Sequence, residues 1–203
     1  MTNKLTQVLG RPVSRETYER LEAYVKLLVV ENERQNLVSR GTLEGLWDRH
    51  IIDSAQLIGF EPRPGSAWVD IGSGAGLPGV IVACLVEGPV MLVEPRRLRA
   101  DFLQRVVSEL GLPAEVRQAK AERITGSFDV ITGRAVASLS RFLSMCDHLS
   151  TKKTVWVLPK GRSAQSELVE ARRTWQGNFR VEPSVTDDDA KIVVATEVRA
   201  GKR

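Results

Sequence analysis

Three glycines stand close together after a short apolar run that predicts a buried strand. The run is Ala67-Trp-Val-Asp-Ile-Gly, and the segment that follows reads Gly72-Ser-Gly-Ala-Gly-Leu-Pro-Gly. Glycine lets the backbone approach a ligand closely and adopt a positive φ. A loop between a strand and a helix at the carboxyl edge of a parallel sheet is where nucleotide-like ligands bind. We therefore expect Gly72, Gly74 and Gly76 to form part of a binding site.

Charges around this loop separate two classes of cofactor, because the match of residues 74–79 to the pattern G-x-G-x-x-G is weak by itself. The carboxylate of Asp70 would repel a pyrophosphate but suit a ligand with an ammonium and a sulfonium. Pro78 removes an N–H from the helix start, a donor that phosphate-free S-adenosylmethionine does not need. Glu94 ends the second predicted strand, where an acid accepts from the ribose hydroxyls of either cofactor. S-adenosylmethionine is favoured, with a loop-bracing role for Asp70 as the alternative.

The ends of the third and fourth predicted strands supply further candidate cofactor contacts. Ala121 and Glu122 follow the third strand, where an adenine would lie against apolar atoms with a polar group near its amine. Glu122 has an alternative role as an acid in the first turn of a surface helix. Arg134 comes two residues after the fourth strand, and we expect it where cofactor and substrate meet.

The residues after the fourth strand also limit which atom could receive a methyl group. Methylation of the exocyclic amines of adenine or cytosine favours an Asn/Asp-Pro-Pro-aromatic element there, whereas this chain has Thr132-Gly-Arg-Ala. Carbon methylation of pyrimidines needs a cysteine nucleophile at a strand end, but Cys84 and Cys146 lie in predicted apolar helices. A purine ring nitrogen, a hydroxyl and a carboxylate remain. Guanine N7 needs no general base, which agrees with the lack of an obvious acid–base pair.

The elements that must position these residues alternate between strands and helices after a Pro- and Gly-rich connector at residues 61–66. Strands are predicted at residues 67–72, 90–94, 114–118, 128–132, 154–158, 179–185 and 192–198. Helices are predicted from residue 78 and at 96–110, 138–149 and 163–174. This alternation predicts an α/β fold with a doubly wound, mostly parallel seven-stranded sheet. The last two strands lack an intervening helix and must form an antiparallel hairpin.

The first 60 residues have helical periodicity and form a predicted N-terminal helical extension packed on a domain of residues 61–203. One helix carries an apolar stripe of Tyr18, Leu21, Val25, Leu28 and Val29, with Ser14 as a possible N-cap. A second helix is predicted at residues 42–58.

Composition bounds the class of protein. The 203 residues suit one domain, and 42% hydrophobic with 27% charged residues excludes a disordered or fibrous chain. The longest apolar stretches fall well short of the roughly 18 residues that a membrane helix needs. Because the N-terminus has no apolar segment and the two cysteines read as reduced core thiols, we expect a cytoplasmic protein. The net charge of +4 comes entirely from residues 61–203, which makes a polyanionic partner plausible.

Five motifs occur in an order that resembles a known family. They are Asn36-Leu-Val-Ser, Trp47-Asp-Arg-His-Ile-Ile-Asp-Ser, Val69-Asp-Ile-Gly-Ser-Gly-Ala-Gly-Leu-Pro-Gly, Thr132-Gly-Arg-Ala and Leu158-Pro-Lys-Gly. Together they resemble the bacterial small-subunit ribosomal RNA guanine-N7 methyltransferases (the RsmG or GidB family), from about residue 32 to residue 198. The resemblance implies a Rossmann-like methyltransferase sheet and S-adenosylmethionine-dependent methylation of N7 of one guanine in 16S ribosomal RNA. It also implies a 16S RNA or small-subunit particle as partner.

The same resemblance assigns site residues. The implied cofactor contacts are Gly72, Leu77, Ala121, Glu122 and Arg134, with Glu94 at the ribose. The implied RNA-facing residues of the N-terminal segment are Asn36, Arg49, His50, Asp53 and Ser54. Two departures from the family pattern are Pro95 after the second strand's acid and Ala119-Lys120 before the Ala-Glu pair.

Two basic residues after the fifth strand complete the candidate site. We expect Lys160 and Arg162 to contact RNA phosphates, since such contacts position RNA without reading its bases. Arg134, Lys160 and His50 are the candidate catalytic residues, and we expect no metal, no membrane contact and a monomer. A lone His on an apolar helical face is more often a core or bracing residue, and Arg49 and Asp53 could form an ordinary i, i+4 ion pair.

Three other functions remain open on the sequence alone. They are a methyltransferase that acts on a small molecule or a protein, a nicotinamide-dependent oxidoreductase, and a non-catalytic RNA-binding module with a vestigial pocket.

Overall fold

The computed structural model describes residues 2–39, 41 and 45–201. Within them a seven-stranded sheet has the order β3-β2-β1-β4-β5-β7-β6. The strands are β1 (Trp68–Ile71), β2 (Val90–Val93), β3 (Ala114–Arg117), β4 (Val130–Thr132), β5 (Val155–Lys160), β6 (Trp175–Pro183) and β7 (Lys191–Ala200). The α-helices are α1 (Thr2–Leu9), α2 (Arg15–Gln35), α4 (Asp53–Ala55), α5 (Gly79–Leu85), α6 (Arg97–Leu110), α7 (Leu139–Cys146) and α8 (Ala164–Ala171). Other helical segments are η1 (Trp47–Ile52), η2 (Gln56–Phe60), η3 (Ala121–Arg123) and η4 (Asp147–Leu149).

The pairing of the strands confirms the predicted fold class. β1 to β5 are mutually parallel, because β1 pairs with β2 and β4, β2 with β3, and β4 with β5. β7 lies antiparallel to β5 and to β6. All four residues of β1 are buried, as expected of a central strand that is covered on both faces.

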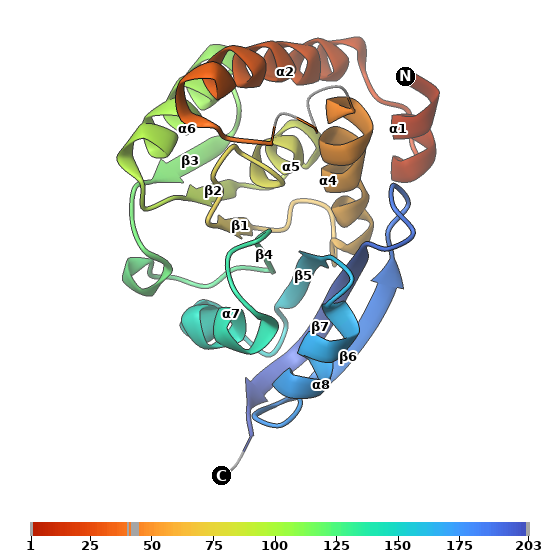
Figure 1. The fold of residues 1–203 in the computed structure, drawn as a ribbon, viewed down its shortest axis with the longest axis vertical. Helices are drawn as coiled ribbons and strands as arrows, with labels where there is room; N and C mark the ends of the chain where they lie inside the picture. Colours follow the sequence, from red (N-terminus) through yellow and green to blue (C-terminus); the bar gives the residue numbers. More distant parts are fainter. Residues whose placement is uncertain (1, 40, 42–44, 202–203) are drawn as a thin grey trace.

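Two hydrophobic clusters cover the two faces of the sheet. α5 and α6 pack on one face together with the N-terminal helices. α7 and α8 pack on the opposite face. Figure 1 shows this division, with α2 lying along α6 and with α7 and α8 across the sheet from them. Cys84 and Cys146 are free and buried in these two cores, and burial raises the pKa of each thiol to about 12.

The first long helix begins at the N-cap that the sequence predicts. The hydroxyl of Ser14 accepts from the backbone N–H of Thr17, and the helix ends at Asn36, which has a positive φ of 50°. The predicted apolar stripe was wrong at one position, because Val29 is 40% exposed. Tyr24 is fully buried instead, and its hydroxyl donates to the carbonyl oxygen of Ala75 at 2.9 Å. α2 thus contacts the glycine loop directly. The domain boundary expected at residue 60 stays a prediction.

The single helix predicted at residues 42–58 was wrong. Residues 42–44 lie outside the described residues; beyond them η1 is a π-helix, α4 is one α-turn and η2 is a 3-10 helix. The reason lies in burial, since Ile51, Ile52 and residues 54–57 are nearly all removed from solvent. One α-helical stripe cannot bury so many consecutive residues. A change of helical pitch turns them all inward.

Strand β6 begins four residues earlier than predicted, and α8 ends three residues earlier than predicted. The residues between Trp175 and Phe179 are polar and exposed on the edge of the sheet, so they lack the apolar alternation of a strand.

Among the described helices we find none with the length and hydropathy that a bilayer crossing requires.

Candidate cofactor and substrate site

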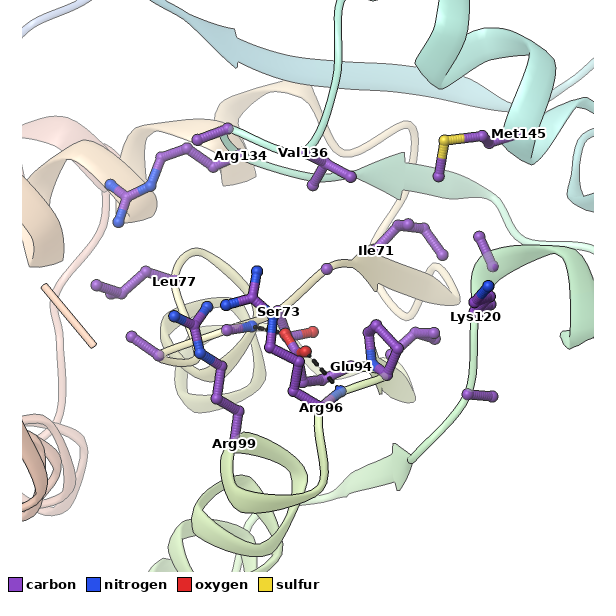
Figure 2. A pocket seen from close by; sticks show the side chains of 18 of the residues that line it. Ile71, Ser73, Leu77, Glu94, Arg96, Arg99, Lys120, Arg134, Val136 and Met145 are labelled. Carbon is purple, nitrogen blue, oxygen red and sulfur yellow. Dashed lines mark hydrogen bonds between the residues drawn. The ribbon is translucent and has the colours of Figure 1, made fainter. Parts of the chain in front are cut away.

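The main cavity of the site lies at the carboxyl ends of β1, β2, β3 and β4. Its volume is about 460 Å³. It is lined by residues 37–38, 71–75, 77, 93–96, 99, 119–122, 134–136, 141 and 145. The loops predicted to follow the first four strands therefore open into one pocket, which we call the first pocket (Figure 2).

The glycine loop requires its glycines for two different reasons. Gly72 and Gly74 line the first pocket with positive φ values of 71° and 56°. Gly76 has a φ of 97° and packs away from the lining, where a Cβ would stand 2.5 Å from a methyl carbon of Val80. The expectation that Gly76 contacts the cofactor is thus not supported, because its role is to let α5 pack under the loop.

Glu94 connects the loop to the end of β2. Its side chain is 3% exposed, and each carboxylate oxygen accepts one backbone N–H, from Gly74 and from Arg96, both at 2.9 Å. A carboxylate oxygen has further lone pairs after one such bond. Glu94 lines the pocket and can still accept from two hydroxyls of a bound nucleoside.

Asp70 lies beneath the loop and not in the pocket lining, contrary to the expectation that its charge faces the ligand. It is 1% exposed, and its Oδ2 accepts from the backbone N–H of Gly79, the first residue of α5, at 3.0 Å. Burial raises the pKa of Asp70 to about 7, although hydrogen bonds from Ser73 and Gly79 act in the opposite direction. Asp70 therefore braces the loop against the start of α5. Its carboxylate does not face the pocket, so it does not discriminate against a pyrophosphate.

The other predicted cofactor residues stand around the same opening. Leu77, Ala121, Glu122 and Arg134 all line the first pocket. In Figure 2, Lys120 and Arg134 lie on different walls of the pocket, with Glu94 between them. Apolar lining comes from Ile71, Val93, Val136 and Met145, and the last two had no sequence signal.

A second pocket of about 330 Å³ adjoins the first, and Arg134 and Ala135 line both. Lys160 lines it but is only 11% exposed, and its Nζ lies 2.9 Å from a carboxylate oxygen of Glu167 and donates to the carbonyl oxygen of Ala137 at 2.9 Å. Burial alone would raise the pKa of Glu167, but hydrogen bonds from Ser163 and Lys160 lower it below its usual value. Lys160 is thus held inside the protein, contrary to the expectation of a free phosphate contact.

Asp53 joins three segments beside this second pocket. Its Oδ2 lies 3.4 Å from Nη1 of Arg134, while its Oδ1 accepts from the hydroxyl of Thr186 at 3.0 Å and from the amide of Gln56 at 2.8 Å. The spacing of Asp53 and Arg49 allows an i, i+4 ion pair between them. In the structure the carboxylate of Asp53 pairs with Arg134 instead. No sequence pattern could point to Thr186 as a partner of Asp53, because the two residues are 133 positions apart.

His50 and Ser54 are enclosed in the N-terminal segment. Among the described residues, the two ring nitrogens of His50 have no hydrogen-bond partner. The hydroxyl of Ser54 has none either. Burial, with the charges of Arg134 and Arg49 adding to it, lowers the pKa of His50 to about 4. His50 is therefore neutral at pH 7, and the charge of Arg134 contributes to the lowering of its pKa.

The remaining RNA-facing candidates lie at three separate places. Asn36 ends α2 and is not part of the lining of either pocket. Arg49 is exposed and lines a further cavity together with His50 and Asp53. Arg162 is exposed and forms an ion pair with Asp189.

Solved structures with a similar fold include methyltransferases. One is a SAM dependent methyltransferase from Aquifex aeolicus, with a TM-score of 0.61 and 15% identity over 75% of this chain and 93% of that chain. Another is a variant of MtNAS in complex with S-adenosylmethionine, with a TM-score of 0.58 and 18% identity over 89% of this chain and 75% of that chain. These similarities show that the chain has the fold of the Rossmann-like methyltransferases.

Sequence similarity places the chain within that class. The model of the family described as "GidB: rRNA small subunit methyltransferase G" matches residues 17–191, and the chain belongs to this family. A "Ribosomal RNA small subunit methyltransferase G" from Zymomonas mobilis is 42% identical over 98% of this chain and 93% of its own length. A relative of the same name from Erythrobacter litoralis is 48% identical over 87% of this chain and 86% of its own length.

Proposed function

We propose that this protein transfers a methyl group from S-adenosylmethionine to N7 of a guanine in 16S ribosomal RNA of the small subunit. The observation that carries the proposal is the shared wall of the two pockets at Arg134 and Ala135. A methyl donor in the first pocket and an acceptor base in the second would meet at this wall. Family membership supports ribosomal RNA as the acceptor.

The residues of the first pocket fit the methyl donor. Glu94 is fixed by two backbone N–H groups and is placed to accept from the ribose hydroxyls. Ala121 and Glu122 would lie along the adenine, and Gly72, Leu77 and Arg134 would surround the methionine end. The bound cofactor supplies an electrophilic methyl group, and the protein supplies alignment.

Among the described residues beside Arg134, Asp53 is its ion-pair partner and His50 is neutral at pH 7, and guanine N7 as the acceptor needs neither an acid nor a base. This atom carries a free lone pair at neutral pH, so no proton has to leave it before the new bond forms. Rate enhancement then rests on proximity and alignment of the two reactants. His50, with its pKa lowered to about 4, cannot act as a cationic acid at pH 7. We assign Asp53 to holding Arg134 in place.

The geometry divides the predicted substrate residues into two groups. Arg49 and Arg162 are exposed and are proposed to contact RNA phosphates. Lys160 and Asp53 are engaged within the protein and are proposed to position the loop that carries Arg134. For Asn36 and Ser54, a helix end and a buried hydroxyl, the structure supports a local structural role.

The test uses purified protein with tritiated S-adenosylmethionine and either deproteinised 16S RNA or small-subunit particles from cells lacking the activity. We expect tritium in one of these substrates, and mass spectrometry of the digested RNA should identify 7-methylguanosine. Calorimetry should show binding of S-adenosylmethionine and none of NAD. Methyl incorporation into another base, or binding of NAD in place of the methyl donor, would overturn the proposal.

A further inference from the structure

Four basic side chains line the first pocket and stand apart from their neighbours. Arg96, Arg99, Lys120 and Arg141 all line this pocket. Neighbouring cations are paired, as Arg97 is with Asp101 and Arg134 is with Asp53. Within the part of the chain that the structure describes, the four side chains form no ion pair. We call them the rim cations.

The rim cations face few negative charges across the pocket. The acidic residues of the lining are Glu94 and Glu122, and Glu94 is buried with both oxygens already accepting backbone N–H groups. The proposed cofactor brings one carboxylate together with an ammonium and a sulfonium, so it cannot neutralise four cations. Uncompensated like charges at one opening raise the free energy of the protein, and a polyanion removes that cost.

The rim cations come from three different segments. Arg96 and Arg99 lie at the start of α6, Lys120 follows β3, and Arg141 belongs to α7. Figure 2 shows Arg96 and Arg99 on one wall of the pocket and Lys120 on another. Arg96, Lys120 and Arg141 are exposed and Arg99 is half-buried. A polyanion that lies across the mouth of the pocket can contact all four, because each of them lines the pocket and three of them are exposed.

We propose that the phosphate backbone of the RNA substrate lies across this mouth on the rim cations and closes the cofactor pocket. This inference rests on the proposed RNA methylation and adds a position for the RNA and an order of binding. The methyl donor has to enter before the RNA covers the opening. The demethylated cofactor has to leave after the RNA.

The first test neutralises one cation at a time, in Arg96→Gln and Lys120→Gln. Lys152→Gln is the matched control, since Lys152 is an exposed cation in the turn before β5, at the opposite edge of the sheet. Each rim variant should weaken 16S RNA binding about 5- to 10-fold at low salt and flatten the slope of log affinity against log salt by about one. The affinity for S-adenosylmethionine should stay within about threefold of the wild type, because the backbone N–H of Arg96 that holds Glu94 is retained.

The second test measures the release of S-adenosylhomocysteine from the wild-type protein by stopped-flow, with and without saturating RNA. We expect RNA to slow the release at least about 10-fold and Arg96→Gln to remove much of this effect.

Three results would overturn the inference. They are an unchanged release rate, rim variants that bind RNA as the Lys152 control does, and rim variants that lose the methyl donor instead of the RNA. All three can occur in a protein that still methylates 16S RNA, which separates this failure from failure of the proposed function.

Discussion

Glu94 is the residue on which cofactor binding depends most directly. Replacing it by glutamine keeps the shape but turns one accepting oxygen into an N–H₂ donor that meets a backbone N–H. Hydrogen bonds to charged groups contribute about 1.5–3 kcal/mol each, so Glu94→Gln should weaken S-adenosylmethionine binding about 10- to 100-fold by calorimetry. Glu115→Gln, an exposed change on β3, is the control and should bind normally. Equal affinity in the two variants would contradict the role of Glu94.

Asp70 gives the protein a pH-dependent stability. Its pKa is raised from 3.8 to about 7 by burial, so the folded protein binds a proton that the unfolded chain releases between these values. The resulting stabilisation is complete below pH 3.8 and is lost as the pH rises towards 7.

The variant Asp70→Asn removes this titration. The free energy of unfolding of the wild type, relative to the variant, should fall by on the order of 3 kcal/mol between pH 4 and pH 7.5. Urea unfolding at a series of pH values measures this difference. A difference that does not change with pH would show that Asp70 titrates normally.

Single residues are also where prediction from the sequence failed. Asp70 and Lys160 both stand at strand ends, which the pattern located correctly, but a pattern does not tell whether a side chain turns to the ligand or to its own protein. The partners that turn them inward are Gly79 and Glu167, nine and seven residues away. Glu94, in contrast, was predicted to face the ligand and lines the first pocket.

At the scale of elements, Asp53 connects the N-terminal segment to the loop after β4. Asp53→Asn removes the charge that pairs with Arg134 while keeping the side chain's size. We expect kcat to fall about 10-fold with a change below threefold in cofactor affinity, because Arg134 stays present but is less well fixed. Asp48→Asn is the control, since Asp48 pairs with Lys4 on the surface. A variant with normal kcat would exclude a positioning role.

The pair of Lys160 and Glu167 joins β5 to α8 beside the second pocket. A double-mutant cycle with Lys160→Met and Glu167→Gln measures their coupling in the free energy of unfolding. We expect about 1–3 kcal/mol, above the value for exposed pairs, because Lys160 is 11% exposed. A coupling near zero, together with a flatter salt dependence of RNA binding in Lys160→Met, would restore the phosphate contact expected from the sequence.

The strands of the central sheet could be predicted because the signals that define them lie within a few consecutive residues. β1 and β2 are short apolar runs that end at Ile71 and Val93, before turn-forming residues. The segment around η1 could not be predicted, since its π-helical turn results from burial against other elements. The start of β6 was missed because an edge strand needs no apolar alternation.

For the whole molecule, the charge distribution and the arrangement of the pockets support the same interpretation. The first pocket is lined by the buried acid Glu94 and by the rim cations, which form no ion pair among the described residues. The second pocket opens beside it and shares the wall at Arg134. A small methyl donor inside and a polyanionic acceptor outside account for both features.

The most direct test of methyl transfer to guanine N7 compares 16S RNA from cells with and without this protein by mass spectrometry of nuclease fragments. We expect a single 7-methylguanosine that disappears when the gene is deleted and returns when it is restored. A restored gene that carries Glu94→Gln should return little of it. Identical modification patterns with and without the protein, or loss of a methyl group at another atom, would contradict the account.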